Sequence, residues 1–158
     1  MIPSFGQHTH DRDILIWAAG AADIWPATVE PPAIAFILES ARSRYTDWKR
    51  GWVWEHFAAP YAAAAAPEAI DWIGEYARTR DEPPLVFVWD SDVMLELRNG
   101  VELTLLLEED YPSEFCVTNA RTDYLICASH EEWVYALGDA LPWFERRKRQ
   151  QAVPMERT

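Results

Sequence analysis

In the first half of the chain, apolar residues recur at intervals of three and four positions, which is the spacing of one helix face. The first stripe follows prolines at 31 and 32 that suit a helix start, and it comprises Ile34, Ile37, Leu38, Ala41 and Tyr45. The second begins after Pro67 and comprises Ile70, Ile73 and Ala77. We predict a helix that ends at Gly51, another that ends before 81–84, and a further helix over 11–23. The segment 52–66 fits either helix or packed loop.

Beyond Pro84 the spacing changes to that of strands. Residues 85–89 form a continuous apolar run, which is typical of a central strand covered on both faces. Apolar and polar residues then alternate over 93–97 and over 101–107, on either side of Asn99-Gly100. A three-residue loop brings the two apolar rows to the same face of the sheet. We therefore predict a hairpin with Gly100 in a left-handed conformation.

A second hairpin is predicted from the apolar segments 115–118 and 123–127. In this register Cys116 lies opposite Leu125, and Cys127 is a diagonal neighbour at about 7 Å, which is longer than a disulfide usually spans. Two buried, reduced thiols are therefore expected.

The C-terminal region predicts one more helix. Ser129 followed by Glu132 has the spacing of a capping box, and a basic run after Phe144 suits a helix C-terminus. We predict a helix over 130–148, kinked at Pro142, and a frayed tail over 150–158. The predicted fold is a single α+β domain over 1–158, with N-terminal helices, an antiparallel meander of about five strands (85–127) and this C-terminal helix.

Charge adds to this picture. Between Asp81 and Asp139 the chain has 14 acidic residues and two basic ones, a balance of -12 that equals the formal net charge of all 158 residues. Such a field attracts basic surfaces and repels nucleic acid. The apolar run over 14–22 is too short and too interrupted for a membrane span or a signal peptide. We expect a cytoplasmic protein that binds neither nucleic acid nor membrane.

The first predicted hairpin gives the charge a location. Its second face would carry Met94, Glu96, Glu102, Thr104, Leu106 and Glu108, with Glu109, Asp110 and Tyr111 at its edge. Glu96 would lie directly opposite Glu102, a like-charge pair that costs about 0.2 to 1 kcal/mol. Such a pair suggests a surface held for a cationic partner. The alternative is an ordinary solvated face of an antiparallel sheet.

Candidate chemistry is sparse. His8, His10, Asp11 and Asp13 gather metal-capable groups, but the sequence offers no second ligand cluster, so no metal and no cofactor are expected. A glycine-rich phosphate loop, a nucleophile elbow and a dinucleotide fingerprint are all absent from the sequence. His56 and His130 have no evident catalytic partner. These patterns favour a non-catalytic protein, and the alternative is a small hydrolase or metal-dependent enzyme with His, Asp or Glu residues that the sequence does not identify.

Residues 114–119 and 122–127, about a tenth of the chain, resemble a strand-turn-strand pattern of small, poorly characterised bacterial α+β proteins, some of them immunity-like. In those proteins an Asn- and His-rich stretch follows the second strand, whereas this chain has Ser129-His130-Glu131-Glu132. The resemblance implies the strand pairing and no catalytic residues. Acidic charge with abundant aromatic residues predicts an immunity or inhibitor protein that neutralises a basic bacterial toxin or effector.

Overall fold

The computed structural model describes residues 4–47, 53–89 and 92–152, and their side chains over 12–151. Within these ranges it contains five α-helices, one 3-10 turn and seven strands, which confirms the α+β class. The helices are α1 (Ser4–Ala21), α2 (Pro31–Tyr45), α3 (Glu68–Ala77), α4 (Gly100–Glu109) and α5 (Ala140–Ala152), with the 3-10 turn η1 (Val53–Glu55). The strands are β1 (Ala27–Thr28), β2 (Tyr61–Ala65), β3 (Leu85–Phe87), β4 (Met94–Glu96), β5 (Phe115–Thr118), β6 (Tyr124–Ala128) and β7 (Trp133–Gly138).

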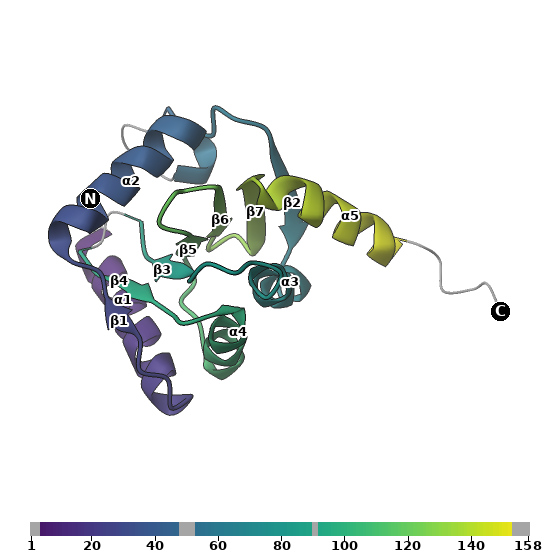
Figure 1. Cartoon of the computed structure of the whole chain (residues 1–158). Helices are drawn as coiled ribbons and strands as arrows, with labels where there is room; N and C mark the ends of the chain where they lie inside the picture. The colour runs from purple at the N-terminus through teal and green to yellow at the C-terminus, as the bar shows by residue number, and fades with distance from the viewer. Residues whose placement is uncertain (1–3, 48–52, 90–91, 153–158) are drawn as a thin grey trace.

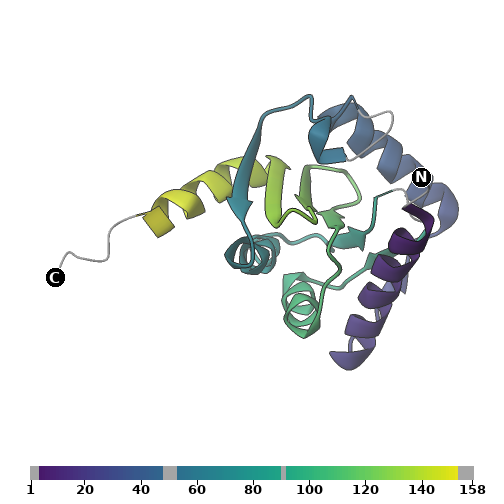
Figure 2. The same ribbon diagram turned by 180° about the vertical axis from the view of Figure 1, so that it is seen from behind.

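The seven strands form one antiparallel sheet in the order β1-β4-β3-β5-β6-β7-β2. Helix α2 covers one face of this sheet, and α1, α3 and α4 cover the other (Figure 1). The view from behind shows the same layers, with α5 extending away from the sheet (Figure 2). Because both faces are covered, every residue of β3, β5 and β6 is buried.

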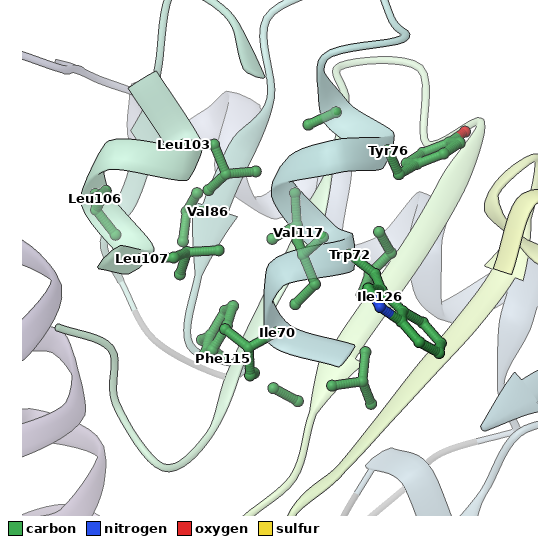
Figure 3. Close-up of a cluster of buried hydrophobic side chains, with 14 of the residues drawn as sticks. Ile70, Trp72, Tyr76, Val86, Leu103, Leu106, Leu107, Phe115, Val117 and Ile126 are labelled. Carbon is green, nitrogen blue, oxygen red and sulfur yellow. The ribbon is translucent and has the colours of Figure 1, made fainter. Parts of the chain in front are cut away.

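Alternate residues of the strands enter two separate cores. Val86, Val117 and Ile126 point towards α3 and α4, where they pack against Ile70 of α3 and against leucines of α4 (Figure 3). The second core lies beneath α2 and is built from neighbouring strand positions, among them Leu85, Phe87, Cys116, Leu125 and Cys127. The sheet therefore separates two apolar layers, and a shift of one residue in any strand would exchange them.

The predicted helices of the first half are confirmed, with different limits. The apolar stripe of α3 is buried, and so is that of α2 except for the half-buried Leu38. Helix α1 begins before the predicted residue 11, at Ser4. Helix α2 ends at Tyr45, and the predicted stop at Gly51 lies outside the described residues. The undecided segment contains η1 and the strand β2, so its alanine run is an extended edge strand.

The predicted strand over 101–107 is wrong, because this segment forms α4. Asn99 caps the helix: its side chain accepts a hydrogen bond from the backbone N–H of Glu102 at 3.0 Å. The Glu102 carboxylate in turn accepts from the N–H of Arg98 at 2.8 Å. Asn99-Gly100 therefore starts a helix, and the predicted hairpin and left-handed Gly100 do not occur.

The predicted helix over 130–148 is also wrong in its first part, since residues 133–138 form β7. Ser129 and Trp133 close a three-residue loop, in which the N–H of Ser129 donates to the carbonyl of Trp133 at 2.8 Å and Glu132 has a φ of 65°. The capping-box spacing thus belongs to a β-turn. Helix α5 begins at Ala140, so Pro142 lies in its first turn, where a missing N–H costs little.

The second predicted hairpin exists as β5 and β6, but its register differs by two residues. Cys116 lies directly opposite Cys127, and their sulfur atoms are 3.3 Å apart. The connecting loop is longer than predicted because two side-chain hydrogen bonds hold it. The Thr118 hydroxyl donates to the carbonyl of Tyr124, and the Asn119 side chain accepts from the N–H of Asp123. Both thiols are free and buried, and burial raises the pKa of Cys116.

Candidate functional site

The structure does not bring the nine predicted surface residues to one sheet face. Met94 and Leu106 are completely buried, in the two different cores. Glu96 is exposed on β4, whereas Glu102 lies in the first turn of α4. The opposed pair of glutamates therefore does not exist, because α4 replaces the strand on which its register depended. Instead of repelling Glu96, the Glu102 carboxylate lies 3.2 Å from Arg98.

Four of the other predicted residues lie at or after the end of α4. Glu108 and Glu109 are exposed in its last turn, followed by the exposed Asp110. The Asp110 carboxylate accepts a hydrogen bond from the N–H of Tyr111 at 2.8 Å. Tyr111 is half-buried, with its ring 6.0 Å from that of Phe115. This end of α4 is thus a carboxylate cluster beside a partly buried aromatic ring.

Thr104 and Glu108 line a groove between α3 and α4. The groove has a volume of about 260 Å³, and its lining comprises Ile70, Asp71, Gly74, Glu75, Arg78, Thr104, Leu107 and Glu108. Gly74 allows the two helices to approach closely, because a Cβ there would lie 2.4 Å from the Thr104 hydroxyl oxygen. Ile70 and Leu107 also belong to the core shown in Figure 3, so the groove has an apolar floor.

The charge of this α3–α4 groove is predominantly negative. Asp71 and Glu75 are four residues apart and so lie on one face of α3, and Glu108 faces them from α4. The Glu75 carboxylate lies 3.0 Å from Arg147 of α5, and Arg78 is within 3.4 Å of the Thr104 hydroxyl. Chemically, the groove offers oxygen acceptors above an apolar floor, which suits a lysine or arginine side chain.

The solvent-facing side of α4 adds apolar surface next to the groove. Val101 and Leu105 are 53% and 45% exposed. Together with Glu108 they recur at positions i, i+4 and i+7, so they form one stripe along the helix. This arrangement places two apolar side chains beside a carboxylate, which is the mixture that protein interfaces use for anchoring and orientation.

A second charged cluster lies at the end of the sheet near the C-terminus of α3. Arg80 forms ion pairs with Glu82, with Asp123 at 3.4 Å and with Asp139 at 3.2 Å, and Asn119 donates to Glu82 and Asp123 at 2.9 Å each. The side chain of Arg80 is only 20% exposed. This Arg80 cluster therefore joins three loops and satisfies its carboxylates internally.

The pKa values of the Arg80 cluster show the same mutual stabilisation. The hydrogen bond from Asn119 lowers the pKa of Asp123, and the neighbouring Arg121 and Arg80 lower it further. For Glu82, burial raises the pKa, but hydrogen bonds from Arg80 and Asn119 outweigh burial, so that the pKa is lowered. These carboxylates are held ionised, as structural ion pairs require.

A third cluster joins Glu114 and His130. The buried Glu114 carboxylate lies 3.2 Å from Nδ1 of His130 and orients the ring, while Trp54 contacts the ring edge at a centroid distance of 5.6 Å. The adjoining cavity of about 280 Å³ is also lined by Ser113 and Ser129. A carboxylate that orients a histidine is one component of acid–base catalysis. This pair cannot be recognised from the amino-acid pattern, because its members belong to different loops.

Within the described side chains, no group of three or more His, Cys, Asp or Glu residues is placed to hold a metal ion. The side chains of His8, His10 and Asp11 lie outside the described set. Among the described residues, no helix has both the length and the apolar character that a membrane span requires.

Comparisons of the chain with protein-family models, with curated proteins and with solved structures found no significant match. The resemblance of residues 114–127 to immunity-like proteins therefore stays a prediction.

Proposed function

We propose that this protein is a non-catalytic binding module that holds a basic segment of a partner protein in the α3–α4 groove, as an inhibitor or immunity protein of a basic bacterial toxin or effector would. One observation carries the proposal: Asp71 and Glu108 converge from two helices on a groove with an apolar floor, beside Glu75, which Arg147 binds. The net charge of -12 also attracts a basic partner over longer distances.

The proposal assigns different tasks to the charged and the apolar residues. Carboxylates around the groove attract a basic partner and increase the association rate, an effect that salt screens. Val101 and Leu105 are exposed on the same helix and supply apolar contact area, which contributes affinity once the partner is in place. The predicted surface on the sheet is thereby replaced by a surface on two helices, which keeps only Thr104 and Glu108 of the original set.

The test is charge reversal in the groove. The double variant Asp71→Lys and Glu108→Lys should lose the partner captured by the wild-type protein from lysate of its native host, because two attractive contacts become repulsive. With the purified partner, we expect an association rate lower by about tenfold or more at low salt. Stopped-flow or surface-plasmon measurements at several salt concentrations would determine this rate.

The control is Glu30→Lys, which makes half of this charge change at an exposed position beside α2, on the opposite face of the sheet. This variant should keep the partner and lose little association rate. If the double variant binds as fast as Glu30→Lys, or if the wild-type rate does not change with salt, the groove is not the docking site.

A further inference from the structure

The outer edge of the sheet at β2 is a second surface with its own chemistry. β2 is the outermost strand at one side of the sheet, and within the described residues it pairs with β7 alone. The N–H of Ala66 donates to the carbonyl of Glu132 at 2.9 Å. Because such pairs recur at every second residue of an antiparallel ladder, the backbone groups of Ala62 and Ala64 also face β7. Those of the intervening residues point outwards.

The outward-facing residues are Tyr61, Ala63 and Ala65. An independent contact confirms this direction: Lys148 of α5 donates from Nζ to the carbonyl of Ala63 at 2.6 Å. Edge strands are commonly protected by proline, a bulge or an inward-pointing charge. The sequence of β2, Tyr-Ala-Ala-Ala-Ala, contains none of these within the strand. Small side chains leave its backbone accessible, and Lys148 covers a single carbonyl group.

A groove of about 410 Å³ lies beside this edge. Its lining includes Ala63 and Ala65 of β2, Trp133 of β7, and Lys148 and Gln151 of α5. Figure 1 shows α5 running outwards past β2, so the helix forms a wall next to the strand. An extended chain in this position could pair with β2 and place a side chain against Trp133, which is 44% exposed.

Charge indicates which extended chain fits. Helix α5 carries four consecutive cations, Arg146 to Arg149, of which Arg147 is bound to Glu75 and the others are exposed. Within the groove lining, Glu68 is the one acidic residue and Lys148 is the one basic residue. A second copy of the protein would bring the same α5 cations together at this edge. An acidic segment of a different protein meets Lys148 and the exposed Arg146 and Arg149 instead.

We propose that β2 accepts an extended, acidic segment of another protein as an additional strand, held by main-chain hydrogen bonds to Tyr61, Ala63 and Ala65. On binding, Lys148 exchanges the carbonyl of Ala63 for a carboxylate of the incoming segment. This β2 edge site has the opposite charge preference to the α3–α4 groove and involves other elements. Its existence is therefore independent of the proposed function.

The probe is a fluorescein-labelled peptide of alternating Glu and Val, compared with one of alternating Lys and Val. In the double variant Asp71→Lys and Glu108→Lys, which removes the α3–α4 groove as a site for the basic peptide, the acidic peptide should bind more tightly than the basic one by about tenfold or more. In ¹⁵N spectra of the wild-type protein, the amides of Tyr61, Ala63 and Ala65 should shift and become protected from exchange. Every second amide of the bound peptide would face β2, and the others would face away from it. N-methylation of the amides that face β2 should abolish binding, whereas N-methylation of the other amides should leave binding unchanged.

Two variants test the contacts. Ala63→Pro removes an outward N–H while the hydrogen bonds to β7 remain, so binding should weaken by about tenfold; Ala63→Val keeps the N–H and should bind as the wild type does. Lys148→Glu should weaken acidic-peptide binding about tenfold, and Arg149→Glu, outside the groove lining, by about twofold at most. Unchanged affinity in both Ala63→Pro and Lys148→Glu would overturn the proposal. Amide shifts confined to other elements would also overturn it. A wild-type dimer that Ala63→Pro dissociates would overturn it as well, because a second copy of the protein would then occupy the β2 edge.

Discussion

Gly138 ends β7 in a conformation that few other residues adopt. Its φ is 66°, and a Cβ at this position would lie 2.5 Å from both the carbonyl oxygen of Asp123 and the hydroxyl oxygen of Tyr45. The chain passes this close because the Tyr45 hydroxyl donates to the carbonyl of Thr122 at 2.7 Å, which ties α2 to the loop between β5 and β6. A glycine here thus permits three elements to meet.

Gly138→Ala should therefore lower the free energy of unfolding by about 2 kcal/mol or more, since it combines left-handed strain with two backbone or side-chain collisions. Gly20→Ala in α1 is the matched control, because a Cβ there meets no atom within 4 Å. It should be neutral or stabilising by up to about 1 kcal/mol. Urea denaturation followed by circular dichroism gives both values, and equal effects would contradict the described contacts.

The Arg80 cluster makes stability depend on acidity. The pKa values of Glu82 and Asp123 are lowered below 4.5 and 3.8, their ordinary values. The unfolded chain then binds more protons than the folded one in acid, so the contribution is present above about pH 4.5 and is lost as pH falls through the lowered pKa values. Between pH 5 and pH 3 the free energy of unfolding should decrease.

The variant Arg80→Met should show a smaller decrease over the same interval. Glu82 loses the hydrogen bond that lowers its pKa most, and Asp123, whose pKa Asn119 and Arg121 continue to lower, loses one of its neighbouring cations. Urea denaturation of both proteins at a series of pH values provides the comparison. A parallel pH dependence would mean that other carboxylates dominate the acid response. Arg146→Met is a suitable control, since Arg146 is exposed on α5 and lies outside the Arg80 cluster.

At the scale of whole elements, α4 shows why apolar spacing did not decide between helix and strand. The segment has apolar residues at alternate positions from Val101 to Leu107, but also at 103, 106 and 107. The second set is buried, whereas Val101 and Leu105 are about half exposed. The spacing of a strand and the spacing of a helix coexist in this segment because residues 105–107 are three consecutive leucines. The hydrogen bonds at Asn99 and the packing against α3 favour the helix.

Replacement of Asn99 by Ala should lower the free energy of unfolding by about 1 kcal/mol, because the side chain caps α4 through the N–H of Glu102. Asn99→Asp keeps an acceptor at the same place and should lose much less. Chemical denaturation measures both variants. If Asn99→Ala and Asn99→Asp were equally stable, the cap would contribute nothing to the helix.

The whole molecule separates its charges onto different surfaces. Carboxylates converge between α3 and α4, while exposed cations extend along α5 beside the β2 edge. The candidate site was only partly predictable. Thr104 and Glu108 were predicted for a hairpin face that does not exist, and they share the groove because they are four residues apart on α4. Asp71 and Glu75 were missed, although their four-residue spacing on an amphipathic helix was a usable signal. Met94 and Leu106 were wrongly included because a strand register was assumed for residues that form a helix.

The amino-acid pattern was sufficient for the α+β class, the helices α2 and α3, the strands at 85–87, 94–96, 115–118 and 124–128, and the excess of acidic charge. These features depend on local periodicity and composition, which a chain carries whatever its environment. Long-range packing was needed to make 101–107 a helix and 133–138 and 61–65 strands, and to place Cys116 opposite Cys127. Each of these segments has weak or double local preferences, so the energy of burial and of pairing with distant residues determines its conformation.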